Sequence, residues 1–303
     1  MREQVISELE RTGVPFTVNA PMHTYTTWKI GGRCDLIVFP RTIEEISAAV
    51  RILNAEAVPW MVIGKGSNML VSDEGFRGAV LRLAGEWDTA SFNEDGVLAG
   101  GGFSLITLSL QAAKHGFAGL EFAGGIPGTV GGAVCMNAGA HGSDVSQILS
   151  RAFVMDEKGD AFWLEARDLA FSYRESVLQR KPWIVLKALF SLSRGDRLTI
   201  AENTKRYKEK RMRTQPLKQP SCGSVFRNPL PLFAAEILES CGLKGYSIGG
   251  AQISGLHANF IVNTGGATAD DVRALIRLAQ ARAKQERGVD LVTEVKFVGF
   301  SSE

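Results

Sequence analysis

In the first part of the chain, segments whose apolar residues have helical spacing alternate with segments that have the apolar runs of strands. Residues 2–12 have the period of an amphipathic helix, which Gly13 ends. A second helix is predicted to begin at Thr42, because Glu45 stands three residues further on in the capping-box position and an apolar stripe follows. Short apolar runs predict strands at 35–39, 59–63 and 78–83. Together these elements predict a small first lobe of β-α-β-loop-β order.

The middle of the chain changes to longer strands and glycine-rich connections. A strand from Val97 meets Gly100-Gly101-Gly102, and Ser104 is in position to cap a helix that reaches His115. Further strands are predicted at 148–155, 161–165, 171–176 and 183–193. A turn at 157–160 joins the first two of these. These strands predict a second lobe.

The polar and charged residues at 193–196 predict a domain boundary, which separates the second lobe from a third part of the chain. Beyond it the pattern predicts a basic helix at 199–213, which is typical of a solvated face but would also attract phosphates. The other elements predicted here are helices at 232–241 and from Thr268, and strands at 257–263 and 291–298. The chain is therefore divided into a first lobe (1–84), a second lobe (85–195) and a smaller domain (196–303).

The composition argues against several classes of function. The 303 residues carry 34 Lys and Arg against 32 Asp and Glu, and a net charge of +2 gives no whole-protein attraction to nucleic acid or membranes. No apolar run approaches the roughly 20 residues that span a bilayer, and the charged start at 1–10 is unlike a signal peptide. The four cysteines form no CxxC pair, which argues against a metal site and for reduced thiols in the cytoplasm. A monomer is favoured, with the oligomeric state left open.

A glycine loop with phosphate-binding chemistry follows the strand predicted at 59–63. It consists of Gly64-Lys65-Gly66-Ser67-Asn68. Glycines permit the positive φ values that turn backbone N–H groups into one concavity, and such a concavity holds a phosphate without a matching side chain. A tight turn between two strands is the alternative. The dinucleotide motif GxGxxG fails because Met69 stands at its sixth position, and the Walker pattern fails at every Gly-Lys pair.

A second glycine-rich stretch runs from Ala123 to Ala133 and continues to Asn137-Ala138-Gly139. Its neighbours are apolar, whereas a flexible linker would be polar. Apolar glycine-rich backbone usually marks a close approach, so this stretch is predicted to pack flat against a large planar ligand. A purely structural role in the fold is the alternative.

The two loops, in this order, resemble the FAD-binding fold of the vanillyl-alcohol oxidase type. Further motifs extend the resemblance over nearly the whole chain, to the UDP-N-acetylenolpyruvoylglucosamine reductase family: Thr27–Gly32, Ser172–Ser176, Gly223–Pro229 and Glu294–Lys296. The resemblance implies an α+β chain, with a two-lobed FAD-binding unit followed by a smaller α+β substrate-binding domain. The chain resembles the shorter branch of the family, because 193–221 has no obvious counterpart of the inserted segment with a substrate-contacting tyrosine.

The resemblance also implies an activity and its cofactors. The implied reaction is the NADPH-dependent, FAD-mediated reduction of UDP-N-acetylglucosamine enolpyruvate to UDP-N-acetylmuramate, in the synthesis of peptidoglycan precursors for the cell wall. The FAD is expected to be noncovalent, because no histidine or cysteine stands between Gly64 and Leu70. The alternatives are another FAD-dependent oxidase or dehydrogenase of this fold, acting on a sugar or hydroxy acid, and a nucleotide-binding regulator without enzymatic activity.

Residue by residue, the resemblance assigns three groups of side chains. The residues assigned to FAD are Gly64, Lys65, Gly66, Ser67, Asn68, Gly125, Ile126, Pro127, Gly128, Thr129, Gly131, Gly132, Asn137, Ala138 and Gly139. Those assigned to the substrate are Tyr173, Arg174, Asn228 and His257. The catalytic residues are Arg174 and Glu294, which polarise the substrate carboxylate, and Ser224, which donates a proton.

Two of the catalytic residues have simpler alternatives in the sequence itself. Arg174 is expected in a strand-like segment, where its planar fork of donors suits a carboxylate but also a surface ion pair with Glu175. Ser224 has no histidine motif beside it, so a hydrolase triad is not indicated. A loop serine that bonds its own backbone is the common alternative.

Glu294 is expected in the closing strand. The two-residue period places it on one face with Val292 and Val298. A carboxyl group among apolar neighbours has a raised pKa, which suits an acid that donates a hydrogen bond. An ion pair with Lys296 on the same face is the alternative.

Overall fold

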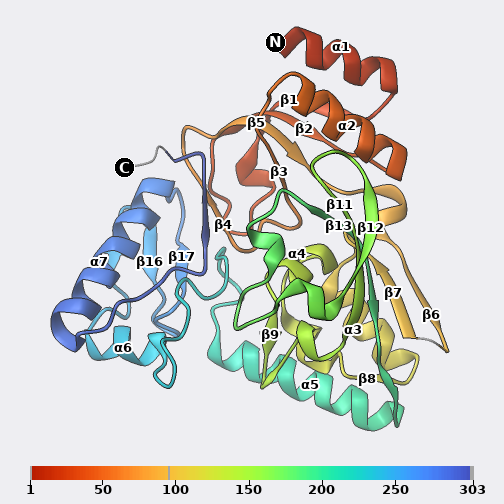
Figure 1. The fold of residues 1–303 in the computed structure, drawn as a ribbon. Coiled ribbons are helices and arrows are strands. Elements are labelled where there is room, and N and C mark those ends of the chain that lie inside the picture. Colours follow the sequence, from red (N-terminus) through yellow and green to blue (C-terminus); the bar gives the residue numbers. More distant parts are fainter. Residues whose placement is uncertain (1, 95, 301–303) are drawn as a thin grey trace. The chain divides into compact units, whose positions relative to one another are not determined.

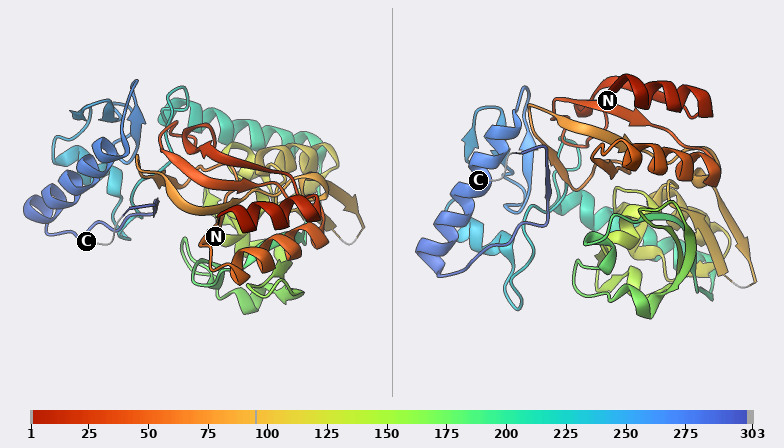
Figure 2. Two further views of the ribbon diagram at one scale, coloured as in Figure 1. Left: turned by 90° about the horizontal axis from the view of Figure 1, so that it is seen from above. Right: turned by 45° about the horizontal axis from the view of Figure 1, so that its top comes forward.

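The computed structural model describes residues 2–94 and 96–300, and the chain divides into two compact units (Figures 1 and 2). Unit 1 comprises the residues up to Val18, Leu36–Gly64 and Gly78–Glu209. Unit 2 comprises Asn19–Asp35, Lys65–Arg77 and the residues from Lys210 onward. The units are interleaved in sequence, because two early segments belong with the C-terminal part. The division at 84 and 195 stays a prediction about domains.

The α-helices of the described residues are α1 (Arg2–Thr12), α2 (Ile43–Ala55), α3 (Leu105–Lys114), α4 (Val130–Cys135), α5 (Arg197–Thr214), α6 (Ala234–Ser240) and α7 (Ala269–Arg287). Several begin at the capping residues that the sequence predicts. The Thr42 hydroxyl accepts the Glu45 N–H at the start of α2, and Ser104 caps α3. At α7, Thr268 and Asp271 form a complete capping box, in which each side chain accepts the other residue's N–H.

The strands are β1 (Phe16–Pro21), β2 (Arg33–Val38), β3 (Trp60–Val62), β4 (Met69–Val71), β5 (Phe76–Leu81), β6 (Ala90–Asn93), β7 (Gly96–Gly100), β8 (Phe117–Ala118), β9 (Gly139–Ala140), β10 (Ser143–Asp144), β11 (Leu149–Met155), β12 (Ala161–Glu165), β13 (Ile184–Phe190), β14 (Ser193–Arg194), β15 (Ser247–Ile248), β16 (Ala251–Ile253), β17 (Ile261–Asn263) and β18 (Lys296–Val298). Short pairs join β9 with β10 and β8 with β14.

Two sheets organise unit 1. One is antiparallel throughout, with the order β12-β11-β13-β7-β6, and α4 packs against β13 and β7. The other has the order β1-β2-β5-β3, and residues 16–18, 36–38, 60–62 and 78–81 of its strands belong to unit 1. Its apolar residues share a core with α1 and α2, which lie side by side (Figure 1). Val38, Ile46 and Leu81 are fully buried in that core. This first lobe has the β-α-β order that its apolar pattern predicts.

Unit 2 contains an antiparallel sheet of order β15-β16-β17, with α6 and α7 sharing its core. A separate parallel pair joins β4 to β18, in the register Met69 to Lys296. The indole of Trp28, fully buried, donates its N–H to the carbonyl of Ile261 over 2.7 Å. The early segments at 19–35 and 65–77 are therefore bonded into the same core as the residues beyond 210.

Three predicted strands are wrong in whole or in part. The segment 171–176 is a tight turn, in which Ser172 and Glu175 pair with each other. In the range 257–263 only β17 is a strand, because a turn joins Phe260 to His257. In the range 291–298 the strand is limited to β18. The aromatic and β-branched residues of each segment favour a strand. In the folded chain, however, side-chain burial and turn geometry determine the backbone conformation.

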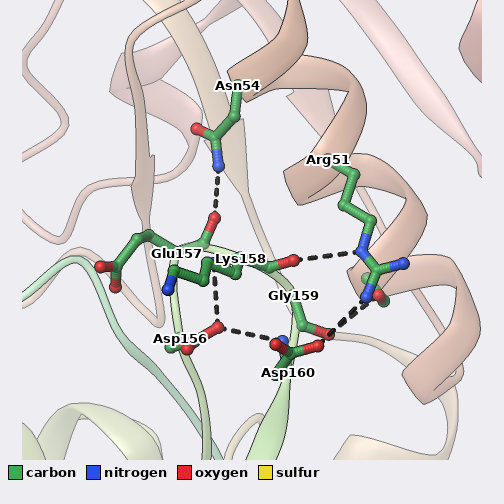
Figure 3. Close-up of polar contacts among 8 residues, drawn as sticks. Arg51, Asn54, Asp156, Glu157, Lys158, Gly159 and Asp160 are labelled. Atoms are coloured by element: carbon green, nitrogen blue, oxygen red, sulfur yellow. Dashed lines mark hydrogen bonds and ion pairs between the residues drawn. The ribbon is translucent and has the colours of Figure 1, made fainter.

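The turn between β11 and β12 is held by one face of α2 (Figure 3). Ser47 donates to the carbonyl of Gly159 over 2.9 Å, and Arg51 donates to that of Lys158 over 3.1 Å. Arg51 also pairs with Asp160, and Asn54 donates to the carbonyl of Glu157. An exposed ion pair adds little stability by itself. The set of bonds to backbone carbonyls, however, aligns this hairpin with the helix of the first lobe.

Gly159→Val should destabilise unit 1 by about 1–3 kcal/mol, because Gly159 has a φ of +82° and valine is strained there. A Cβ at this position would also lie 2.8 Å from the Ser47 hydroxyl and disturb the contact with α2. Gly13→Val is a matched control, since Gly13 has a φ of +74° with open space around it. Chemical denaturation should show a larger loss for Gly159→Val; equal losses would mean that the contact with α2 adds nothing.

Candidate active site

The loop predicted to bind phosphate packs against residues 25–27 of unit 2. Gly66 has a φ of +60°, and a Cβ on it would lie 2.2 Å from the carbonyl oxygen of Tyr25. The carbonyl of Gly66 accepts the Thr27 N–H over 3.3 Å. Only glycine fits this position. The close backbone approach and the left-handed conformation are the features that an anion-binding concavity requires.

Gly64, the first residue of this loop, meets the second glycine-rich stretch within unit 1. A Cβ on Gly64 would lie 2.5 Å from the hydroxyl of Thr129. Thr129 caps α4 by accepting the Gly132 N–H over 3.3 Å. The Gly131 N–H donates to the carbonyl of Gly101 over 2.9 Å. Three glycine-rich segments far apart in sequence therefore lie in contact within unit 1.

Asn137 connects the end of the second stretch to the turn that carries Arg174. Its side chain is buried, with its Oδ1 accepting the Ser146 N–H over 3.0 Å and its Nδ2 donating to the carbonyl of Ser172 over 2.9 Å. The Arg174 guanidinium donates to the carbonyl of Gly139 over 2.8 Å. These bonds hold the Arg174 turn beside residues 137–139. The Asn137 amide serves the fold, so any contact of this residue with a cofactor would have to come from its backbone.

Arg174 lies at the tip of a hairpin turn and not in a strand-like segment. Its φ is +60°, which is uncommon for a residue other than glycine, asparagine or aspartate. The N–H of Ser172 and the N–H of Glu175 each donate to the other residue's carbonyl, which closes the turn. The guanidinium carbon lies 5.4 Å from the centre of the Tyr173 ring. Strain of this kind, held by surrounding bonds, is common at functional sites.

Ser224 and Glu294 come together within unit 2. Ser224 follows Gly223, whose φ is +83°, and precedes the fully buried Val225. The Glu294 N–H donates to the carbonyl of Val225 over 2.8 Å, and Phe226 forms an antiparallel bridge with Thr293. Ser224 and Glu294 thus occupy adjacent segments. Across residues 2–94 and 96–300, no group bonds the Ser224 hydroxyl.

The reason given from sequence for an apolar setting of Glu294 is wrong. Glu294 precedes β18, and Val292 is 58% exposed, so the two do not share a buried strand face. Glu294 itself is half-buried. The deeply buried group beside it is the Cys222 thiol, whose pKa is raised by burial and, to a lesser degree, by the charge of Glu294.

The two substrate candidates of unit 2 differ in what their side chains do. The Oδ1 of Asn228 accepts the Ala234 N–H over 3.1 Å, so this side chain caps the first turn of α6. The Nδ1 of His257 accepts the Asn259 N–H over 3.3 Å. This bond leaves the imidazole proton on Nε2, where it can be donated to a ligand. His257 therefore keeps a donor that its bond to Asn259 does not use.

Unfolding measured against pH should reveal the burial of His257. Burial lowers the pKa of His257, and the charge of Lys244 acts in the same direction. The unfolded chain takes up this proton near an ordinary pKa of about 6.5, whereas the folded chain takes it up only at lower pH. The stability is therefore complete above about pH 6.5 and falls as the pH drops below it. His257→Gln should lose less stability over this range; equal losses in denaturant midpoint would contradict the assignment.

Comparison with known proteins relates these features to a family. Residues 34–165 match the model of an FAD binding domain, and residues 215–298 match that of the C-terminal domain of UDP-N-acetylenolpyruvoylglucosamine reductase. A UDP-N-acetylenolpyruvoylglucosamine reductase of Halalkalibacterium halodurans is 47% identical over 298 residues, covering 98% of this chain and 99% of the relative. The chain belongs to the UDP-N-acetylenolpyruvoylglucosamine reductase family.

Solved structures agree with this family and with the predicted fold class. The crystal structure of the UDP-N-acetylenolpyruvylglucosamine reductase of Thermus caldophilus has a TM-score of 0.81 and 35% identity, and the match covers 94% of this chain and 98% of that one. A berberine bridge enzyme variant matches 65% of this chain and 44% of its own length, with a TM-score of 0.51 and 14% identity, which shows likeness of fold alone. The predicted α+β fold, with an FAD-binding part followed by a smaller domain, is confirmed.

The residues of this reductase fit FAD. Gly64 and Gly66 both stand where a Cβ would collide with neighbouring protein atoms, so this loop needs glycine at both positions. Both belong to the loop whose chemistry suits a diphosphate. The C-terminal match at 215–298 disfavours the alternative of a sugar or hydroxy-acid oxidase, since that alternative shares only the FAD-binding part. Among the described residues, no helix is long and apolar enough to cross a membrane.

Sequence reasoning missed one residue of this reductase's site region. Asn259 is 3% exposed and bonds the backbone of Phe226, two residues after Ser224. It stands in an ordinary apolar context, His257-Ala258-Asn259-Phe260, within a range predicted to be a strand. The only indication of this role in the sequence was an asparagine standing among residues that the structure shows to be buried.

Proposed function

We propose that this chain reduces UDP-N-acetylglucosamine enolpyruvate to UDP-N-acetylmuramate, with NADPH as the electron donor and noncovalent FAD as the cofactor. The observation that carries the proposal is that Ser224 and Glu294 lie on adjacent segments, joined by the bond from the Glu294 N–H to the Val225 carbonyl, inside the stretch that matches the reductase C-terminal domain. It is supported by 47% identity to a relative of this name over almost the full length of both chains. The product is a precursor of peptidoglycan, made in the cytoplasm by a protein that we expect to be monomeric.

The glycine-rich loops would hold the cofactor. Gly64–Asn68 would bind its diphosphate through backbone N–H groups, and Gly125–Gly132 would lie along the flavin with Asn137–Gly139 beside it. When bound, FAD supplies the hydride chemistry, by which two electrons pass from NADPH to C3 of the enolpyruvyl group. The protein binds FAD without a covalent bond, since the loop offers no histidine or cysteine.

The side chains of the chain itself handle charge and protons. A hydride added at C3 leaves negative charge at C2 that spreads into the adjacent carboxylate. Arg174 would stabilise that carboxylate through its planar fork of donors, and Glu294 through a hydrogen bond. Ser224 would donate its hydroxyl proton to C2, which completes the saturated lactyl group. Tyr173, Asn228 and His257 would line the substrate.

Ser224 is suited to a proton transfer of this kind by its surroundings. A serine hydroxyl is a very weak acid, so only a strongly basic partner, such as a carbon with carbanion character, takes its proton. The described residues make no bond to this hydroxyl, so no protein acceptor competes for it. The proton would be replaced from solvent after each turnover.

The test uses the purified protein with NADPH and UDP-N-acetylglucosamine enolpyruvate. Oxidation of NADPH should require the enolpyruvyl substrate, and the product should have the mass of UDP-N-acetylmuramate. Acid precipitation should release all of the yellow flavin into the supernatant. NADPH oxidation that is indifferent to the substrate would overturn the proposed reaction, and colour retained in the pellet would overturn noncovalent binding.

A further inference from the structure

Asn259 lies beside the segment that follows Ser224 and forms the hydrogen bonds that a neighbouring strand would otherwise form. Its Oδ1 accepts the Phe226 N–H over 2.9 Å, and its Nδ2 donates to the Phe226 carbonyl over 2.8 Å. Its own carbonyl accepts the Val225 N–H over 2.9 Å. One asparagine therefore satisfies three backbone groups on consecutive residues. A neighbouring strand would satisfy such groups with its own main chain.

The opposite edge of the same segment is bonded to the residues around Glu294. The Val225 carbonyl accepts the Glu294 N–H over 2.8 Å, and the Arg227 N–H donates to the carbonyl of Val292 over 2.9 Å. Residues 225–227 are thus the middle of a three-part arrangement, with 292–294 on one side and Asn259 on the other. Ser224 immediately precedes this supported segment.

Burial makes the Asn259 bonds important for geometry. Val225 and Phe226 are 0% and 2% exposed, and the Asn259 side chain is buried with them. Backbone groups buried without partners are destabilising, so the segment shifts toward other partners when these bonds are removed. The Ser224 hydroxyl makes no bond to a described residue, so its position depends on the backbone that follows it.

We propose that Asn259 is a positioning residue for proton delivery. It fixes the Val225-Phe226 backbone, and thereby aims the Ser224 hydroxyl at C2 of the substrate, without touching the substrate itself. The proposal rests on the proposed function, in which Ser224 is the proton donor. The Asn259 N–H also bonds Nδ1 of His257, so the same residue connects the proton donor to a substrate candidate.

The test compares the two half-reactions in Asn259→Ala and Asn259→Asp. Asn259→Ala removes both side-chain bonds, and we expect substrate to reoxidise the reduced flavin about tenfold to a hundredfold more slowly, since small misplacements of reacting groups have effects of this size. Asn259→Asp keeps an acceptor for the Phe226 N–H and should be slowed less. Reduction of the flavin by NADPH should stay within about twofold of wild type in both, because that step does not use Ser224.

A double-mutant cycle separates positioning from general damage. If Asn259 acts through Ser224, Asn259→Ala should slow reoxidation by less than about twofold when Ser224 is already alanine. Thr268→Ala is the control, because it removes the cap of α7 in the same unit without a bond to residues 224–226. It should lower the thermal midpoint and leave reoxidation unchanged.

Four results would overturn the proposal, of which three concern its specificity or the folding of the variants. They are equal slowing of both half-reactions, an undiminished effect of Asn259→Ala in the Ser224→Ala background, or failure of both Asn259 variants to fold with flavin bound. Reoxidation at the wild-type rate in a folded Asn259→Ala protein would do the same. A wild-type enzyme whose reduced flavin the substrate does not reoxidise would instead refute the proposed function.

Discussion

Ser224→Ala is expected to reoxidise its reduced flavin with the enolpyruvyl substrate at least about a hundredfold more slowly than wild type, which is the usual size of a lost general acid. Flavin reduction by NADPH should be unchanged, because no proton is delivered to C2 in that step. Stopped-flow absorbance of each half-reaction measures both rates. The variant lacks only a hydroxyl that no described residue bonds, so we expect its stability to match wild type.

Glu294 variants test, in the same half-reaction, the second residue that we propose acts on the substrate from unit 2. The charge that develops on the substrate carboxylate would be repelled by an ionised glutamate and stabilised by a hydrogen-bond donor. Ketosteroid isomerase uses a neutral carboxylic acid as a donor of this kind, to stabilise negative charge on its substrate. Glu294→Gln still donates a hydrogen bond, so it should be slowed less than Glu294→Ala.

Parent-rate reoxidation in Ser224→Ala would show that Ser224 is an ordinary loop serine.

Gly66→Ala is expected to purify with little FAD. The added methyl group would lie 2.2 Å from the Tyr25 carbonyl in a backbone of φ +60°. Strain of about 1–3 kcal/mol would be relieved by moving the loop. Affinity for FAD should then fall at least about tenfold, which corresponds to about 1.4 kcal/mol. The ratio of flavin absorbance to protein absorbance after purification, and titration of the apoprotein with FAD, measure the loss.

Gly245→Ala is the matched control for this substitution. Gly245 also lies in unit 2 and has a φ of +77°, but a Cβ on it would meet no atom within 4 Å. It should lose some stability and keep its FAD. Full FAD occupancy in Gly66→Ala would show that this loop does not form the diphosphate site.

The features predicted correctly from sequence are those set by neighbouring residues. The sequence predicts that α7 begins at Thr268, and the Thr268 hydroxyl does accept the Asp271 N–H, because a cap depends on bonds within one turn. The Arg174 turn was mistaken for a strand, since Phe171 and Tyr173 favour strands while bonds from distant residues hold the turn. Glu294 was identified by the resemblance, but the alternation of Val292 and Val298 suggested a strand face that does not exist.

The features that could not be predicted from the sequence depend on contacts between segments that are distant along the chain. Nothing in the local pattern at 257–263 indicates that Asn259 bonds Phe226, because the two are joined only when the chain has folded. The interleaving of the units is of the same kind. Residues 19–35 and 65–77 have ordinary strand and loop patterns, and their assignment to unit 2 follows from bonds such as that between Trp28 and Ile261.

The parallel pairing of β4 with β18 imposes an order on biosynthesis. β4 directly follows the loop at Gly64–Asn68, and its partner strand, Lys296–Val298, leaves the ribosome only after nearly all of the remaining residues. Chain elongation proceeds at about 5–20 residues per second, so β4 remains an unpaired edge for many seconds while unit 1 can already fold. Contacts so distant in sequence also form slowly once both partners exist. A nascent chain stalled before residue 296 would therefore have a folded sheet β12-β11-β13-β7-β6 and a β4 strand, next to the loop at 64–68, that still lacks its partner β18.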